Sequence, residues 1–264
     1  MNPSPIEVVA HRGANDEEPE HSLAAYLKAV EQGADAIECD VRLTADGILV
    51  CVHDRRIDRT SSGRGSVSSK TLEELAAYDY SRSDVVWRDF EEPAGDESRT
   101  DVLTLRMLLA TMLDASPTVR FAIETKHPTR YGKYVEDALV EMLRHFGLTG
   151  VNGGGVARAR IMSFSRIAVQ RVHELAPGNR TVFLMDEVPR RYRDGSLPLG
   201  VSVAGPSIDI IRDHPGYVAH VHDRGGQVHV WTVDTKPDVD LCVRLGVDAI
   251  ITNRPGQVLA MLGR

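Results

Sequence analysis

The stretch AIECDVRLTADGILVCVHD, residues 36–54, puts acidic and histidine side chains into two runs that are otherwise apolar. Glu38 and Asp40 lie in the first run, and the second run ends at His53. Residues two apart on a strand point to the same face, so Glu38 and Asp40 share one face of the first run. Polar side chains at such positions need a partner or a function, because unpaired buried charges are costly.

The two runs are predicted to form a hairpin that rises from the end of a strand. Only Asp46-Gly47 lies between the two arms in this interpretation, and Asp-Gly is a strong signal for a two-residue turn. A parallel crossover would need a dozen residues or more, which the chain does not have here. With Ala45 opposite Ile48, the predicted register brings His53 directly opposite Asp40.

Outside this stretch, short apolar runs alternate with helical patterns over the whole chain. The eight runs are 6–11, 35–41, 119–126, 159–165, 180–185, 200–204, 227–233 and 247–252. The helical patterns are 22–32, 105–113, 133–146, 166–175, 215–224 and 238–245. Such alternation predicts an α/β fold with a parallel sheet, and eight units in 264 residues favour a closed (β/α)8 barrel of the TIM type. An open doubly wound sheet is the alternative, but no glycine-rich phosphate loop follows any strand.

Residues 54–103 form the longest interruption of this alternation. They read as a loop-rich insertion with one short helix, and 81–101 is charged and irregular. Long loops of this kind are often lids, so we expect an insertion that covers the mouth of the barrel. The chain 1–264 is then a single barrel domain.

Composition excludes several classes of function. The net charge of −7 argues against a nucleic-acid partner, which requires a basic face. No apolar run approaches the length of a membrane span, and the first residues do not read as a signal peptide. The 3 cysteines have no metal-binding spacing and favour reduced thiols, so we expect a cytoplasmic protein. The oligomeric state stays open.

Four motifs end strands or the hairpin: His11-Arg12-Gly13, Glu38-Cys39-Asp40, His53-Asp54 and Glu124-Thr125-Lys126. The carboxyl ends of barrel strands meet at one mouth, so Glu38, Asp40 and Glu124 should lie together. Their mutual repulsion favours one divalent cation, and oxygen ligands suit Mg²⁺, Ca²⁺ or Mn²⁺. The alternative is that these acids form ordinary ion pairs with Arg42, Lys126 or Arg12.

Two histidines and two basic side chains complete the predicted site. His11 and His53 each end an apolar strand beside the carboxylates, which suits general acid–base catalysis near neutral pH. Arg12 and Lys126 add fixed positive charge that suits a phosphate. A cation, two histidines and two basic groups together favour phosphodiester cleavage. His21 and the other histidines carry no such signal.

At these residues the chain resembles the glycerophosphodiester phosphodiesterase family. The resemblance spans nearly the whole chain, and its most specific block runs from residue 11 to residue 60. The quoted matches are His11-Arg12-Gly13, Pro19-Glu20-His21-Ser22, Glu38-Cys39-Asp40-Val41, Thr44-Ala45-Asp46-Gly47, His53-Asp54, Arg59-Thr60, Glu124-Thr125-Lys126, Ser163-Phe164-Ser165, Trp231-Thr232-Val233-Asp234 and Ile251-Thr252-Asn253-Arg254-Pro255.

The resemblance implies a barrel enzyme that hydrolyses glycerophosphodiesters, a small-molecule substrate, to glycerol 3-phosphate and an alcohol. It implies Glu38, Asp40 and Glu124 as metal ligands and His11 and His53 as the acid–base pair. It also implies phosphate contacts from Arg12 and Lys126, and contacts near the glycerol end from Phe164 and Trp231.

Two positions depart from the family pattern. His21 stands where asparagine is common, and because it should lie at a helix start we expect altered capping and unaltered chemistry. Asn253 stands where aspartate is usual, and the missing charge should affect which leaving group is accepted.

Two alternatives remain beside a hydrolase of small glycerophosphodiesters. One is a phospholipase D-like enzyme that acts on lysophospholipids, which would need an apolar mouth; the charged segment 81–101 speaks against it. The other is a non-catalytic barrel that binds a phosphoester as a sensor. An intact pair of histidines would be surplus in such a protein, so we favour the enzyme.

Overall fold

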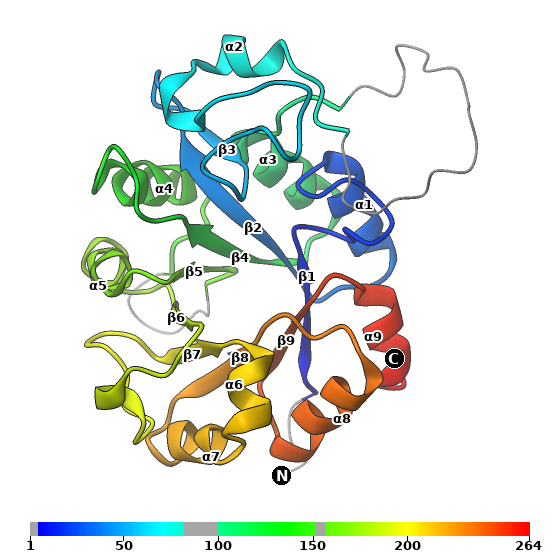
Figure 1. Cartoon of the computed structure of the whole chain (residues 1–264), viewed down its shortest axis with the longest axis vertical. Helices are drawn as coiled ribbons and strands as arrows, with labels where there is room; N and C mark the ends of the chain where they lie inside the picture. The colour runs from blue at the N-terminus through cyan, green and yellow to red at the C-terminus, as the bar shows by residue number, and fades with distance from the viewer. Residues whose placement is uncertain (1–4, 82–99, 151–156) are drawn as a thin grey trace.

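Eight parallel strands close into a barrel with helices on its outside (Figure 1). The computed structural model describes residues 5–81, 100–150 and 157–264. Strand neighbours run β1-β9-β8-β7-β6-β5-β4-β2, and β1 also pairs with β2, which closes the ring. The barrel strands are β1 Glu7–His11, β2 Ala36–Leu43, β4 Arg120–Thr125, β5 Ala159–Ser163, β6 Thr181–Met185, β7 Val203–Pro206, β8 Gln227–Val230 and β9 Ala249–Thr252. The predicted (β/α)8 fold is confirmed.

The helices follow the predicted pattern, with two additions. The predicted ones are α1 Leu23–Glu31, α3 Leu105–Ala115, α4 Tyr134–His145, α5 Arg166–Leu175, α7 Gly216–Asp223 and α8 Lys236–Leu245. Sequence analysis missed α6 Ile208–Asp213 and α9 Pro255–Met261, because each is too short for a clear period of 3.6 residues. Several helices begin at a side-chain cap: the Ser22 hydroxyl, for example, accepts the Ala25 N–H at the start of α1.

Alternation along the strands separates the inside of the barrel from the helix-facing side. The inner face is lined by small and branched side chains in its middle: Val9, Ala36, Ala122, Met162, Val182, Leu184, Val203, Ala249 and Ile251. The same face ends in polar side chains, since His11, Glu38 and Glu124 lie two residues beyond Val9, Ala36 and Ala122. The packed interior thus supports a layer of functional groups at the mouth.

Strand β2 is the longest strand and changes partner along its length. Its lower half, Ala36 to Glu38, pairs with β1, whereas Val41 to Leu43 pairs with the short antiparallel strand β3 Leu49–Cys51. On its other side β2 pairs with β4, and Asp40 stands opposite Glu124 in that register. The strand therefore places Glu38 beside the last residue of β1 and carries Asp40 two residues beyond it, while it stays hydrogen-bonded on both edges.

The predicted hairpin is present, but the register predicted for it is wrong by one residue. Val41 pairs with Cys51 and Leu43 with Leu49, so the turn holds the three residues 45–47 and Asp40 lies opposite Val52. Gly47 has φ +82°, the left-handed conformation expected at the end of a three-residue loop.

Contacts distant in sequence explain this longer turn. The Ala45 N–H donates to the Lys70 carbonyl at 2.7 Å, and the Leu72 N–H donates to the Asp46 carboxylate at 3.1 Å. The Thr44 hydroxyl also donates to Asp46, at 2.6 Å. The turn is therefore built onto the insertion, and its register follows from that docking.

His53 reaches the mouth by another route. It follows β3 and Val52 in an irregular segment, and the Arg42 guanidinium donates to its carbonyl from Nη2 at 2.7 Å and Nε at 3.0 Å. Arg42, which sequence analysis considered as a partner of the acids, instead holds the backbone of His53. His53 therefore still reaches the mouth despite the one-residue difference in register, because it lies beyond the paired strands.

The insertion has its own small apolar core. Val50 and Val52 of the hairpin pack with Ile57, Val67, Leu75, Tyr80 and Val102. Its short elements are η1 Val67–Ser69 and α2 Leu72–Ala76; the latter lies within the predicted short helix and begins with a capping box at Thr71 and Glu74. Residues 82–99, which include most of the charged segment, lie outside the described residues. That 54–103 covers the mouth stays a prediction.

Another short 3-10 helix, η3 Arg190–Tyr192, follows β6. Within the described ranges, no helix has both the length and the apolar character needed to cross a membrane.

A substitution at Gly13 tests how the close contact with α1 stabilises the end of β1. It has φ +88°, and a Cβ there would lie 2.6 Å from the Ala25 carbonyl carbon and from its Cβ. We expect Gly13→Ala to lower the free energy of unfolding by about 2–5 kcal/mol, the sum of backbone strain and overpacking. Urea denaturation measures this. Gly147→Ala is the matched control, because Gly147 has φ +66° and an added Cβ there would meet nothing within 4 Å. Equal losses in both variants would show that the contact with α1 does not matter.

Candidate active site

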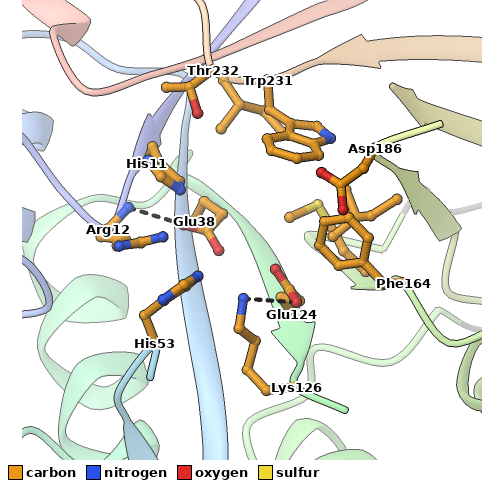
Figure 2. Close-up of a pocket in the computed structure, with 13 residues that line it drawn as sticks. His11, Arg12, Glu38, His53, Glu124, Lys126, Phe164, Asp186, Trp231 and Thr232 are labelled. Carbon is orange, nitrogen blue, oxygen red and sulfur yellow. Dashed lines mark hydrogen bonds and ion pairs between the residues drawn. The ribbon is translucent and has the colours of Figure 1, made fainter. Parts of the chain in front are cut away.

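A cavity of about 350 Å³ opens at the carboxyl ends of the strands (Figure 2). Every residue predicted for the site except Asp40 lines it. The lining residues are His11, Arg12, Glu38, His53, Glu124, Lys126, Met162, Phe164, Leu184, Asp186, Trp231, Thr232 and Ile251. Asp40 lies beneath this surface, with 1 % of its area exposed. Four motifs that are far apart in the sequence therefore meet at one place.

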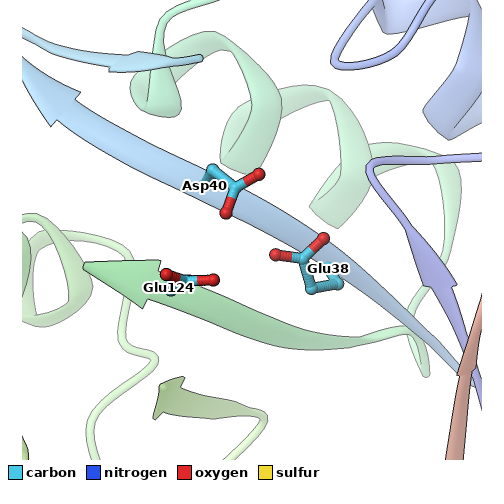
Figure 3. A group of neighbouring side chains, drawn as sticks. All are labelled: Glu38, Asp40 and Glu124. Carbon is cyan, nitrogen blue, oxygen red and sulfur yellow. The ribbon is translucent and has the colours of Figure 1, made fainter. Parts of the chain in front are cut away.

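The three predicted ligands form a buried acidic cluster (Figure 3). Glu38 and Asp40 extend from β2 and Glu124 from β4, and one oxygen of each lies within 4.8 Å of the others. All three side chains are buried. The set consists of carboxylate oxygens alone, which hard divalent cations prefer.

Repulsion within the cluster divides its protons unequally. Burial and the neighbouring Asp40 raise the pKa of Glu38 well above its usual range, and they raise that of Glu124 to about 8. Burial also acts to raise the pKa of Asp40, but Lys126, His21 and Arg12 together bring it well below its usual range. Asp40 is thus ionised near neutral pH, while Glu38 and Glu124 are protonated. A bound cation would relieve this repulsion, so the donor set fits one.

Basic side chains provide part of the compensation. Lys126 Nζ lies 3.0 Å from Asp40 Oδ1 and 2.9 Å from Glu124 Oε1. Arg12 Nε lies 3.1 Å from Asp40 Oδ2, and the Arg12 backbone N–H donates to Glu38 at 3.0 Å. The ion pairs that sequence analysis held as the alternative to a metal site are therefore present with Arg12 and Lys126.

The backbone at Arg12 is unusual for a side-chain-bearing residue. Arg12 has φ +58° and is followed by Gly13 in the same left-handed region. This sharp turn directs the Arg12 N–H toward Glu38 and its guanidinium toward Asp40. Strained conformations of this kind collect at functional sites, where the surrounding contacts hold them.

His11 is held in one orientation by the last strand end. Its Nδ1 lies 2.7 Å from Asn253 Oδ1. The Asn253 amide nitrogen donates to Asp234 at 2.6 Å, and the Asn253 N–H donates to the same carboxylate at 2.8 Å. Because Asp234 accepts from the amide nitrogen, the amide oxygen must face His11, and Nδ1 must carry the proton.

His53 is held in the same tautomer by another acceptor. Its Nδ1 lies 2.7 Å from Asp54 Oδ1, and Arg59 Nε donates to Asp54 Oδ2 at 2.7 Å. Arg59 also donates to Glu20 at 2.7 Å, and Glu20 accepts from Arg12 at 3.2 Å. Burial acts to raise the pKa of Asp54, but Arg59 and His53 lower it to about 2, so it is a permanent acceptor.

Both histidines therefore leave Nε2 available at the cavity. Neither Nε2 has a hydrogen-bond partner among residues 5–81, 100–150 and 157–264. Burial and then Arg12 lower the pKa of His11 to about 3, and burial also lowers that of His53. Each ring is accordingly a proton acceptor at neutral pH.

His21 departs from what its sequence position indicated. The helix cap is Ser22, and His21 instead turns inward, with φ +60°. Its Nε2 donates to Asp40 Oδ2 at 3.0 Å, and its Nδ1 lies 2.7 Å from the Tyr26 hydroxyl. The expectation of altered capping is wrong: His21 contacts a predicted metal ligand, and no local pattern predicts this.

The opposite end of the cavity is apolar and aromatic. Phe164 and Trp231 meet edge to face, with centroids 5.4 Å apart, and Trp231 Nε1 donates to the Gly205 carbonyl at 2.7 Å. Figure 2 shows Trp231 and Thr232 on the side away from His53 and Lys126. Sequence analysis missed Asp186 at this end, although it directly follows β6, where the strand-end rule could have found it.

Comparison with known proteins agrees with this geometry. Residues 11–257 match the model of the glycerophosphoryl diester phosphodiesterase family. The chain belongs to this family. The "Probable glycerophosphodiester phosphodiesterase 1" of Mycobacterium tuberculosis is 43 % identical over 256 residues, which cover 97 % of this chain and 92 % of that protein.

Solved structures of the family share the fold. The Agrobacterium tumefaciens glycerophosphodiester phosphodiesterase superimposes with a TM-score of 0.75 at 27 % identity, over 97 % of this chain and 99 % of that one. An Oleispira antarctica phosphodiesterase, solved in complex with the product sn-glycerol-3-phosphate, has a TM-score of 0.80 at 22 % identity, over 98 % and 97 % of the two chains. The family assignment makes the chain a phosphodiester hydrolase with a buried acidic cluster that fits a divalent cation.

The acidic cluster should bind one divalent cation with release of protons. Calorimetry with Mg²⁺ or Ca²⁺ should show one site, which Glu38→Gln weakens strongly and the triple carboxamide variant lacks. Because Glu124 has a pKa of about 8, binding at pH 7 should release protons, and the protons released by Glu124 should decrease as the pH rises above 8. Glu31→Gln is the control, since Glu31 is exposed on α1. Wild-type binding by the triple variant would contradict the assignment.

Asn253 should act on the reaction through His11. Asn253→Ala removes the acceptor that fixes the His11 tautomer, so we expect kcat to fall about 10–100-fold, with a smaller change in KM. Nitrogen-15 NMR of the histidine rings should show His11 losing its Nδ1–H tautomer. Asn15→Ala is a useful comparison, because Asn15 donates to the same Oδ1 at 2.8 Å and to the His11 carbonyl at 2.8 Å, but forms no hydrogen bond with the His11 ring. An unchanged tautomer in Asn253→Ala would show that Asn253 does not control it.

Proposed function

We propose that this protein hydrolyses glycerophosphodiesters to glycerol 3-phosphate and an alcohol, with a divalent cation and two-histidine acid–base catalysis. One observation carries the proposal. Two histidines, each with Nδ1 fixed by an acceptor, line the same cavity as an acidic cluster that fits a cation. Family membership and the names of the relatives support the substrate class.

Binding of the phosphate is assigned to charge near the carboxylates. Glu38, Asp40 and Glu124 would hold the cation, which when bound supplies positive charge that stabilises a phosphate oxygen. Arg12 and Lys126 add donors beside the same position, and both already lie within 3.1 Å of acidic oxygens in the cluster. A phosphodiester carries the negative charge that this group of donors favours.

The glycerol part is assigned to the apolar end of the cavity. Phe164 and Trp231 offer flat apolar surface, and their edge-to-face contact keeps the two rings in place. Asp186 and Thr232 line the cavity at the same end and can accept or donate hydrogen bonds to hydroxyls. Small polyols need this combination of apolar contact and a few polar groups.

The proton transfers are assigned by exposure. His11 is held within the barrel by Asn253 and is unprotonated at neutral pH, because burial lowers its pKa, so its Nε2 is available to accept the proton from the attacking hydroxyl. The His53 side chain is 33 % exposed at the rim, so it suits the acid that protonates the departing alkoxide. Substrate phosphate adds negative charge beside His53 and favours its protonated form, which Asp54 also stabilises.

The two alternative functions find less support. A lysophospholipid needs an apolar entrance, whereas Arg55, Arg130 and Asp186 line the cavities at and beside this mouth. A non-catalytic sensor has no use for two histidines with fixed tautomers. The identity of the cation among Mg²⁺, Ca²⁺ and Mn²⁺ stays a prediction, as does the cytoplasmic location expected from three cysteines, which are buried and free.

His53→Asn tests the proposed roles. It removes a proton-transfer group and leaves the acidic cluster intact, so release of glycerol 3-phosphate should fall about 10²–10⁴-fold while calorimetry still shows cation binding. His145→Asn is the matched control, because His145 lies exposed on α4. Near-normal turnover by His53→Asn across the pH range would contradict the two-histidine mechanism. Loss of cation binding would instead make His53 a ligand.

A further inference from the structure

A second hollow, lined by residues that closely follow His53 and Lys126 in the sequence, has the chemistry of an anion site. It has a volume of about 430 Å³ and lies between the insertion and the segment after β4. Arg55 and Arg130 line it together with hydroxyl-bearing side chains: Ser66, Ser68, Ser69 and Thr129. No aspartate or glutamate lines it within the described part of the chain. We refer to it as the Arg55–Arg130 groove.

The two arginines of the groove differ from their neighbours in charge pairing. Neither forms an ion pair with any residue in the ranges 5–81, 100–150 and 157–264. Arg130 lies over the ring of Tyr131 at 5.9 Å, a contact that does not use its N–H donors. By contrast, the adjacent Arg56 is paired with Asp58 at 2.9 Å. In a chain with a net charge of −7, two such guanidinium groups in one hollow favour an anionic ligand.

Both walls of the groove are close in sequence to residues of the catalytic cavity. Arg55 comes two residues after His53, and Pro128 two residues after Lys126, and His53 and Lys126 line the catalytic cavity. Two residues span at most about 7 Å, which places both walls within the reach of one small molecule.

The walls are also fixed to each other. The Tyr131 hydroxyl donates to the Ser68 carbonyl at 2.7 Å, which joins the two walls, and the Val67 N–H donates to the Arg55 carbonyl at 3.1 Å within the insertion. In Figure 1 the segment between β4 and α4 accordingly lies beside the insertion.

The side on which the groove lies indicates which part of a substrate it would contact. In the proposed function the glycerol faces Phe164 and Trp231, and the alcohol departs beside His53. Arg55 of the groove comes two residues after His53, so we place the groove on the side of the leaving alcohol. Guanidinium groups and hydroxyls are the donors that phosphate oxygens prefer.

We propose that the Arg55–Arg130 groove binds a second phosphate group carried by the leaving alcohol. The preferred substrates would then be glycerophosphodiesters whose alcohol is itself esterified to another phosphate. This inference rests on the proposed function, because it needs the alcohol to leave past His53. Arg55 and Arg130, which lie outside the family's catalytic motifs, would then contribute to substrate specificity.

A matched pair of substrates tests the proposal. Glycerophosphoglycerol contains one phosphodiester. Bis(glycerophospho)glycerol contains two phosphodiesters, which are linked through a central glycerol. With a divalent cation present, the wild-type enzyme should show the higher kcat/KM for the two-phosphate compound. In the double variant Arg55→Ala, Arg130→Ala this ratio should fall about tenfold, mainly through KM, because charge-assisted hydrogen bonds are lost. High salt should reduce the wild-type ratio as well.

Arg56→Ala is the control for net charge, since it removes the neighbouring arginine, which is paired outside the groove. The proposal is overturned if the double variant keeps the wild-type ratio, or if Arg56→Ala lowers it equally. It is also overturned if phosphatidylglycerol vesicles bind through the two arginines while the soluble two-phosphate ester does not, because the groove would then serve a lipid surface.

Binding to the His53→Asn protein separates this proposal from the proposed function. Calorimetry with that variant should give a lower Kd for the two-phosphate compound than for glycerophosphoglycerol, and adding the two arginine substitutions should remove the difference. Equal Kd values would overturn the groove even if the wild-type enzyme hydrolyses both compounds. A preference in binding, with no release of glycerol 3-phosphate from either compound by the wild type, would support the groove and reject the proposed function.

Discussion

The mutual repulsion of three buried carboxylates is the constraint on which the mouth of this barrel depends. Glu38, Asp40 and Glu124 lie too close together to remain ionised without positive charge around them. Arg12, Lys126 and His21 gather on Asp40, while the Arg12 N–H serves Glu38. The left-handed turn at residues 12 and 13 follows from this need, because it directs one N–H and one guanidinium toward the two acids of β2.

The histidines depend on contacts between the most distant parts of the chain. His11 lies on the first strand and is oriented by Asn253, 242 residues later, and this contact exists only because β1 pairs with β9 to close the barrel. His53 is oriented by Asp54 and Arg59 at the start of the insertion. Glu20 accepts from both Arg59 and Arg12, so the insertion and a proposed phosphate donor are joined in one network. Closure of the barrel and docking of the insertion thus act directly on the geometry of the reaction.

Charge changes sign over a short distance at this end of the molecule. The cavity floor is acidic, the groove beside His53 and Lys126 is basic, and Asp186 lies at the aromatic end. Because the three carboxylates are buried, a cation can compensate them without neutralising the arginines of the groove. The site can therefore hold a cation and attract an anionic ester at once, which a uniformly acidic mouth would repel.

The amino-acid sequence by itself determined the eight strands, most helices, the carboxylates at the strand ends and the two histidines beside them. These depend on local patterns: apolar runs, helix caps and the rule that parallel strands present their carboxyl ends at one mouth. The hairpin register was decided only in the tertiary structure, because Lys70 and Leu72 bind the turn from the insertion. The inward turn of His21 and the orientation of Asn253 were decided there as well. Each depends on a hydrogen-bond partner, Asp40 or Asp234, that folding alone brings into reach.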